Sequence, residues 1–141
     1  MEEYYISRLK GLLTETLEKN GKPFAALVVA NDKIVAEAIN ETHLIQNPTA
    51  HAELLAIQRA SKFLTKEQLS RATLYASGMP CTMCITAAQY AGIVNIVYYY
   101  NIEELQTVYP YKAHLRPVKL CKKDPEQLLH HIEQLHLDSP F

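Results

Sequence analysis

The stretch Ala72-Thr-Leu-Tyr-Ala-Ser-Gly-Met-Pro-Cys-Thr-Met-Cys-Ile-Thr-Ala-Ala-Gln-Tyr-Ala-Gly92 decides the fold class of this chain. Its first part, residues 72–77, alternates in the way that is typical of a β-strand. Its second part, residues 81–91, predicts a helix, because Pro80 is well tolerated at a helix start and Gly92 is a typical stop. A strand that leads directly into a helix is a building unit of α/β sheets.

The rest of the chain continues this succession of helices and strands. Apolar periodicity and turn residues predict helices over residues 3–20, 51–63, 102–107 and 125–137, and strands over residues 24–30, 33–39, 93–99 and, more briefly, 117–120. The turn at Asn31-Asp32 joins two of these strands as a hairpin. The order predicts a single domain over residues 1–141 with a three-layer α/β/α sandwich, in which helices cover both faces of a five-stranded mixed sheet.

Two short motifs place metal-binding side chains at predicted helix starts. Cys81 and Cys84 are three residues apart, so both sulfurs lie on one helical face, and His51 opens an apolar helical pattern. Two thiolates and one imidazole are typical of a catalytic zinc site, which keeps three protein ligands and leaves the fourth position for water. Glu53 lies close to His51 in the sequence and is the expected general acid and base beside one Zn²⁺ ion per chain.

Each motif has a simpler interpretation when it is taken alone. A lone Cys-x-x-Cys is also typical of a redox pair, and a lone His-x-Glu is common by chance on helices. A closed structural zinc site would need a fourth ligand, but there is no second Cys-x-x-Cys, and Cys121 lies far along the chain in a Lys-rich stretch. The two motifs in this order, each at a predicted helix start, therefore favour a catalytic metal site.

Three stretches of the chain also match a known pattern: Lys22–Ala26, Asn47–Glu53 and Pro80–Cys84. A His-x-Glu motif followed by Pro-Cys-x-x-Cys is the signature of the zinc-dependent base deaminases. Over about residues 5–100 the chain resembles the cytidine deaminase-like superfamily, and within it the branch of guanine deaminases, fungal-type cytosine deaminases and tRNA adenosine deaminases. By analogy with that superfamily, a homodimer is expected.

The resemblance also implies a set of substrate-binding residues. Asn40 would hydrogen-bond the base, and Phe24 would line the pocket. The backbone N–H of Ala50 would meet a base carbonyl, the carbonyl of Met79 would hold the departing amine, and the ring of Tyr90 would stack on the base. Phe24 and Tyr90 could instead be packing residues, and Asn40 a turn residue.

Two positions depart from the family pattern. Ala25 follows Phe24 where the family usually has glycine. The methyl group of Ala25 leaves less room for another group to approach the backbone at this position. The sequence closes with Phe141, whereas guanine deaminases carry a C-terminal segment that closes over the pocket, so Phe141 is considered as a shortened lid.

Composition restricts the partners and the compartment. A net charge of −1 is unlike that of a protein that grips nucleic acid through a basic surface, and the basic residues between Lys112 and Lys123 are interpreted as a solvated face. No apolar run approaches the roughly 20 residues that a membrane-spanning helix needs. Three cysteines, two of them in a metal motif, favour a reducing compartment, and the cytoplasm is expected.

These observations predict an enzyme that carries out zinc-dependent hydrolytic deamination of a free nucleobase or a similar amino-heterocycle, guanine above all, with release of ammonia. Deamination of cytosine or cytidine, or of adenosine in tRNA, is left open as an alternative. A zinc-binding interaction domain without catalysis is the alternative from a different class, and the presence of Glu53 argues against it.

Overall fold

The structure is a computed structural model that describes residues 1–113 and 115–138. Phe141, the residue considered as a lid, lies outside the described residues. The chain divides into two compact units, Met1–Tyr111 and Lys112–Phe141. The expectation of a single domain over the whole chain stays a prediction.

The first unit contains one mixed sheet and the helices that cover it. Its elements follow in the order α1 (Glu2–Glu18), β1 (Ala25–Ala30), β2 (Lys33–Ile39), α2 (Ala52–Ala60), α3 (Lys66–Ser70), β3 (Thr73–Gly78), α4 (Thr82–Ala91), β4 (Asn95–Tyr100) and α5 (Ile102–Gln106). The strand order is β2-β1-β3-β4. Strand β1 pairs antiparallel with β2 and β3, whereas β3 and β4 are parallel. The predicted mixed sheet is thus confirmed.

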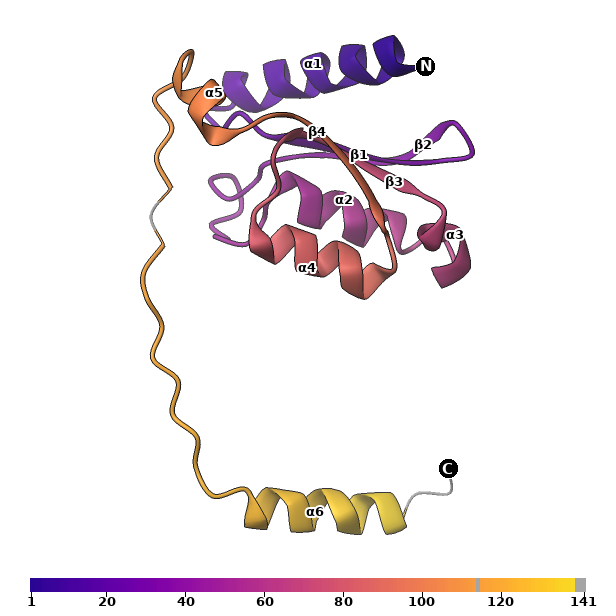
Figure 1. Ribbon diagram of the computed structural model, residues 1–141, viewed down its shortest axis with the longest axis vertical. Helices are drawn as coiled ribbons and strands as arrows, with labels where there is room; N and C mark the ends of the chain where they lie inside the picture. Colours follow the sequence, from indigo (N-terminus) through magenta and orange to yellow (C-terminus); the bar gives the residue numbers. More distant parts are fainter. Residues whose placement is uncertain (114, 139–141) are drawn as a thin grey trace. The chain divides into compact units, whose positions relative to one another are not determined.

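Helices cover both faces of this sheet, as the three-layer prediction requires (Figure 1). On one face, α1 packs Tyr5 and Leu9 against alternate residues of β1, among them Leu27. On the other face, residues of α2 and α4 pack against the intervening β1 residues, among them Val28. Because β1 is buried on both sides, its sequence is an unbroken apolar run.

The predicted fifth strand is wrong, since the sheet formed by residues 1–113 and 115–138 has four strands. Residues 117–120 are assigned no strand, and the side chains of Val118 and Leu120 are exposed. A strand exists only where its backbone pairs with another strand, and a short local pattern cannot specify that partner. Pro117 also lacks the N–H that a ladder would use.

Helix α3 has no counterpart in the sequence prediction. It begins at a capping box, in which the Thr65 side chain accepts from the Gln68 N–H and the Gln68 side chain accepts from the Thr65 N–H. The pattern Thr-x-x-Gln is the sequence signal that could have located it.

The second unit contains α6 (Glu126–Leu137), close to the predicted helix at residues 125–137. Within the described residues, no residue of α6 is buried, and its apolar side chains are exposed: Leu128, Leu129, Ile132, Leu135 and Leu137. An apolar stripe of this kind is typical of a helix that packs against another surface. The homodimer expected from the family resemblance stays a prediction.

Candidate metal and catalytic site

The structure brings the three predicted metal ligands together. His51 Nδ1 lies 3.5 Å from Cys81 Sγ and 3.6 Å from Cys84 Sγ, and the two sulfurs are 3.8 Å apart. Among the residues that the structure describes, this is the one group of three potential ligands close enough to share an ion.

These spacings fit zinc. A tetrahedral Zn²⁺ ion with Zn–S bonds of about 2.3 Å and a Zn–N bond of about 2.0–2.1 Å separates its two sulfurs by about 3.8 Å, and each sulfur from the nitrogen by about 3.6 Å. The three observed distances match this arrangement. Three protein ligands leave the fourth tetrahedral position for a non-protein ligand, as in catalytic zinc sites.

Two helix starts supply the ligands. His51 is the N-cap of α2 and Cys81 is the N-cap of α4, both with extended backbone angles, and Cys84 follows one turn later, fully buried. The N-terminal ends of both helices thus meet at the site, and their dipoles favour negative charge there. This environment suits two metal-bound thiolates.

The protonation states of the ligands also bear on metal binding. Burial lowers the pKa of the His51 imidazole, and the charge of Lys22 lowers it further, so the neutral form that ligates a metal is favoured. Burial, followed by the charges of Glu53 and Cys81, raises the pKa of the Cys84 thiol. A bound cation reverses this preference, because a coordinating thiol loses its proton outright.

Glu53 lies in the first turn of α2 with only 5% of its surface exposed. Burial is the largest influence on this carboxyl group and raises its pKa to about 7, although its own backbone N–H and the Cys84 side chain act in the opposite direction. Such a group exchanges protons readily at neutral pH, as a general acid and base must. Its placement beside Cys84 puts it next to the metal ligands.

A series of backbone hydrogen bonds places two predicted substrate residues beside the ligands. The N–H of Asn40 donates to the Phe24 carbonyl at 3.0 Å, and the N–H of Glu41 donates to the Ala50 carbonyl at 2.9 Å. Ala50 precedes His51, so Asn40 and Phe24 are tied through the chain to the first ligand. The N–H of Ala50, expected to meet a base carbonyl, donates to the Asn47 carbonyl at 3.0 Å, and its substrate role stays a prediction.

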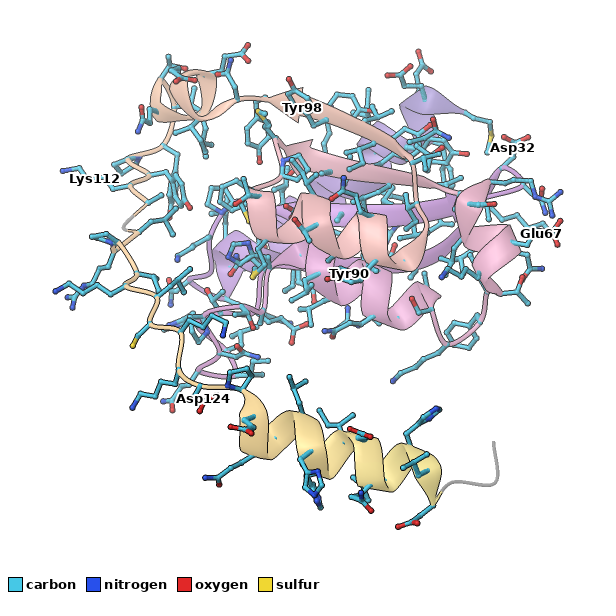
Figure 2. All side chains as sticks on the ribbon, turned by 60° about the horizontal axis from the view of Figure 1, so that its bottom comes forward. Asp32, Glu67, Tyr90, Tyr98, Lys112 and Asp124 are labelled. Carbon is cyan, nitrogen blue, oxygen red and sulfur yellow. The ribbon has the colours of Figure 1, made fainter. Side chains whose placement is uncertain are left out.

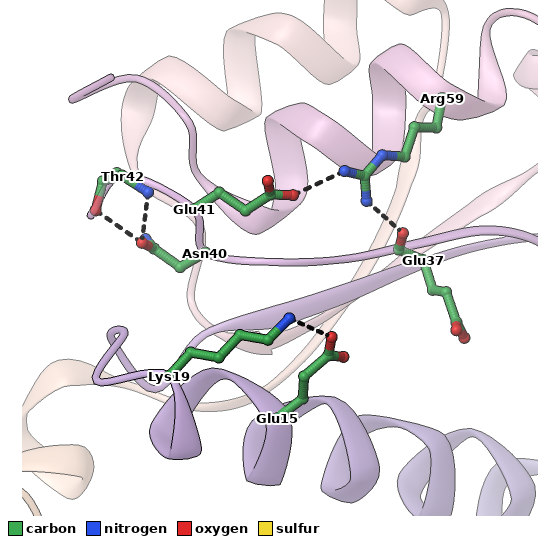
Figure 3. A network of polar contacts seen from close by, with 7 residues as sticks. All are labelled: Glu15, Lys19, Glu37, Asn40, Glu41, Thr42 and Arg59. Carbon is green, nitrogen blue, oxygen red and sulfur yellow. Dashed lines mark hydrogen bonds and ion pairs between the residues drawn. The ribbon is translucent and has the colours of Figure 1, made fainter. Parts of the chain in front are cut away.

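The side chain of Asn40 is buried and held in one orientation. Its Oδ1 accepts from both the backbone N–H and the hydroxyl of Thr42, at 3.1 and 2.8 Å (Figure 3). Because the oxygen is engaged by Thr42, the amide NH₂ group is the end that is left to donate elsewhere. This orientation fits the predicted role of Asn40 as a donor to a base carbonyl.

Three aromatic rings lie together beside the site. The centroids of the Phe24 and Tyr100 rings are 6.4 Å apart, and the two ring planes are inclined by 28°. The Tyr111 ring meets the Phe24 ring edge-on, with the centroids 5.1 Å apart. The Tyr100 hydroxyl donates to the Pro23 carbonyl and lies 3.0 Å from Ser77 Oγ. A glycine at position 78 allows this packing, because a Cβ there would meet the Phe24 and Tyr100 rings at 3.0 Å.

Sequence reasoning did not assign Tyr100 or Tyr111 to the site. Their position depends on how the chain turns after β4, which residue spacing does not reveal. Burial is the main cause that raises the pKa of both phenols, and the negative charge of Glu53 contributes to both. Both hydroxyl groups are therefore electrostatically coupled to the predicted proton carrier.

The last two predicted substrate residues lie at opposite ends of α4. Met79, just before the ligand Cys81, is half-exposed, and its N–H donates to the Tyr100 carbonyl at 2.8 Å. Tyr90 follows Cys81 by nine positions, which is a rise of roughly 13 Å along a helix, and its ring is 84% exposed (Figure 2). The stacking role of Tyr90 gains no support from this placement and stays a prediction.

Comparison with known proteins identifies the family. A family model of MafB19-like deaminases matches residues 2–121. The chain belongs to the MafB19-like deaminase family. This deaminase chain also has relatives in two groups named in the sequence analysis, so its membership of the cytidine deaminase-like superfamily is confirmed.

The guanine deaminase of Bacillus subtilis (strain 168) is 39% identical to this deaminase over 97 residues, 68% of this chain and 62% of the relative. The tRNA-specific adenosine deaminase of Buchnera aphidicola subsp. Baizongia pistaciae (strain Bp) is 35% identical over 92 residues, 65% of this chain and 57% of the relative. The X-ray structure of the Bacillus subtilis guanine deaminase matches with a TM-score of 0.81 at 26% identity, over 100% of this chain and 97% of that one. The chain spans about three fifths of the length of the curated relatives it matches.

Proposed function

We propose that this chain is a zinc-dependent hydrolase that removes the exocyclic amine from a free nucleobase, with guanine as its substrate. The observation that carries the proposal is the set of three distances among His51, Cys81 and Cys84, which fit one tetrahedral zinc ion with an open position. The buried carboxyl group of Glu53 beside that set supports a catalytic rather than a structural site. A structural zinc site would close all four positions.

The chemistry divides between the metal and the chain. Zinc bound by the three ligands would activate a water molecule as the nucleophile at neutral pH. Glu53 would accept a proton from this water and give it to the ring nitrogen next to the attacked carbon. It would then take the second proton from the added hydroxyl and give it to the departing amine. One water molecule is consumed, the C–N bond breaks, and the products are ammonia and a ring carbonyl.

The remaining site residues hold the base in place. The amide NH₂ of Asn40, oriented by Thr42, donates to a carbonyl on the base. A buried site that hydrogen-bonds its substrate rejects analogues strongly, because an unpaired polar group is costly there. A base without a carbonyl to accept from Asn40 should therefore bind much more weakly than one that has it.

The choice of guanine is supported by the similarity to a guanine deaminase over 68% of this chain. The similarity to tRNA-specific adenosine deaminases gives a second candidate, adenosine in tRNA. The net charge of −1 favours the free base, because a protein that binds an RNA strand usually carries a basic surface for the phosphates. Among the described residues, no helix is long and apolar enough to cross a membrane.

The test is ammonia release by the zinc-loaded protein from guanine, cytosine, adenine, their nucleosides and a tRNA with adenosine in its anticodon loop. We expect guanine to give the highest kcat/KM, and filter binding to find no salt-sensitive affinity for tRNA. If the activity were highest on the tRNA and the tRNA bound in a salt-sensitive way, the substrate would be adenosine in tRNA and not a free base. Release from none of these compounds would refute the proposal.

A further inference from the structure

Tyr111 is an aromatic residue from the segment after α5 that lies near the site. Its ring meets the Phe24 ring edge-on, with the centroids 5.1 Å apart and the planes at 78°. Phe24 is bonded through its backbone to Asn40, and Asn40 is tied through the chain to His51. Tyr111 thus approaches the site from a different part of the chain than any predicted site residue.

Two local contacts hold Tyr111 in this position. The Gln106 side chain, at the end of α5, donates from Nε2 to the Tyr111 carbonyl at 3.0 Å. The N–H of Tyr111 donates to the Tyr109 carbonyl at 2.8 Å, which closes a tight turn around Pro110. Since proline fixes its own φ angle, the turn has little freedom. The Tyr111 ring is therefore carried by a turn with restricted conformational freedom.

The electrostatic surroundings of the Tyr111 hydroxyl include two of the predicted site residues. The pKa of this phenol is raised by burial first, and then by the negative charges of Cys81 and Glu53. One of these groups is a metal ligand and the other is the predicted proton carrier. The Tyr111 phenol is therefore within electrostatic range of both groups, and its ring meets the Phe24 ring edge-on.

Two aromatic rings at a steep angle form a corner. A planar heterocycle that lies flat on one ring meets the other edge-on, and both arrangements are favourable for aromatic groups. The charges of Cys81 and Glu53 both influence the Tyr111 side of this corner. The geometry therefore suits a flat base whose reacting edge points to the metal ligands.

We propose that Tyr111 contacts the substrate: its ring and that of Phe24 form the corner that holds the planar base beside Cys81 and Glu53. This inference rests on the proposed function. It assigns to the segment after α5 a part in selecting flat aromatic substrates. Tyr111 would then be a second aromatic contact for the base, next to Phe24.

The test compares the steady-state kinetics of Tyr111→Ala, Tyr111→Phe and Tyr109→Ala on guanine. Stacking of a base on an aromatic side chain contributes enough that its loss raises KM about tenfold to a hundredfold. We expect this rise for Tyr111→Ala with kcat changed less than about threefold, because the ring holds the base and moves no proton. Tyr111→Phe should restore KM, and Tyr109→Ala, a change in the same turn, should leave it unchanged.

A second readout is independent of turnover. Calorimetric binding of guanine to Glu53→Gln should weaken by the same factor when Tyr111→Ala is added, while the zinc content stays the same. An unchanged KM and binding constant for Tyr111→Ala would overturn the inference. Equal losses in Tyr111→Ala and Tyr109→Ala, or a Tyr111→Phe variant as weak as Tyr111→Ala, would overturn it too. A wild-type protein that neither binds guanine nor deaminates any base would instead refute the proposed function, and this inference with it.

Discussion

Glu53→Gln should retain about one zinc ion per chain and lose ammonia release by a factor of roughly 10² to 10⁴ in kcat. The amide has nearly the same shape as the carboxyl group but cannot carry a proton between water and the leaving amine. Because burial disfavours the charged carboxylate, the substitution is not expected to destabilise the fold. The measurement is kcat on guanine together with the zinc content of the same sample.

A matched carboxylate serves as the control for this substitution. Glu67 is exposed at the start of α3 (Figure 2). Its ion pair with Arg71 is a surface contact of 3.4 Å. Exposed pairs of this kind contribute little to stability, so Glu67→Gln should keep the activity and the zinc content of the wild type. Full turnover in Glu53→Gln would remove Glu53 from the mechanism, and loss of zinc in it would give Glu53 a structural role.

Cys84→Ala should abolish zinc binding and most of the stability that zinc confers. Cys84 is fully buried at the junction of α2 and α4, and it is one of the three ligands proposed among the described residues. A ligand that binds only the folded state adds about 4 kcal/mol to the free energy of unfolding when its free concentration is a thousand times its Kd. The variant should lose this increment and, with it, detectable ammonia release.

The comparison is made by urea unfolding with and without a zinc chelator. With chelator, the variant and the wild type should differ only by the small cavity left at position 84; with zinc, the wild type alone should become more stable. Cys121→Ala is the control, because Cys121 is exposed and lies in the second unit. Zinc-dependent stabilisation of Cys84→Ala equal to that of the wild type would contradict the ligand set.

The sequence predicted much of this architecture because its strongest signals are local. The unbroken apolar run of β1 and the strand-to-helix sequence around Cys81 each reflect burial that a short stretch already encodes. The clustering of His51, Cys81 and Cys84 could be predicted for the same reason, since two motifs at two helix starts specify both the residue types and their common position in an α/β sheet.

What the sequence did not predict depends on contacts between distant segments. The segment at residues 117–120 has a strand-like composition, but strand formation requires a partner that its own residues do not specify. Tyr111 lies against Phe24, 87 positions earlier in the chain, and only the turn after α5 brings them together. The family resemblance implies that Tyr90 stacks on the base. Its side chain is exposed near the end of α4, and this role stays a prediction.

The central claim is that His51, Cys81 and Cys84 hold one zinc ion at which a free base is deaminated. A zinc titration of the metal-free protein, followed by ammonia release from guanine, tests both parts of it together. The activity should rise in proportion to added zinc and level off at one ion per chain. Activity that persists in the metal-free protein, or no ammonia release at any zinc content, would contradict it.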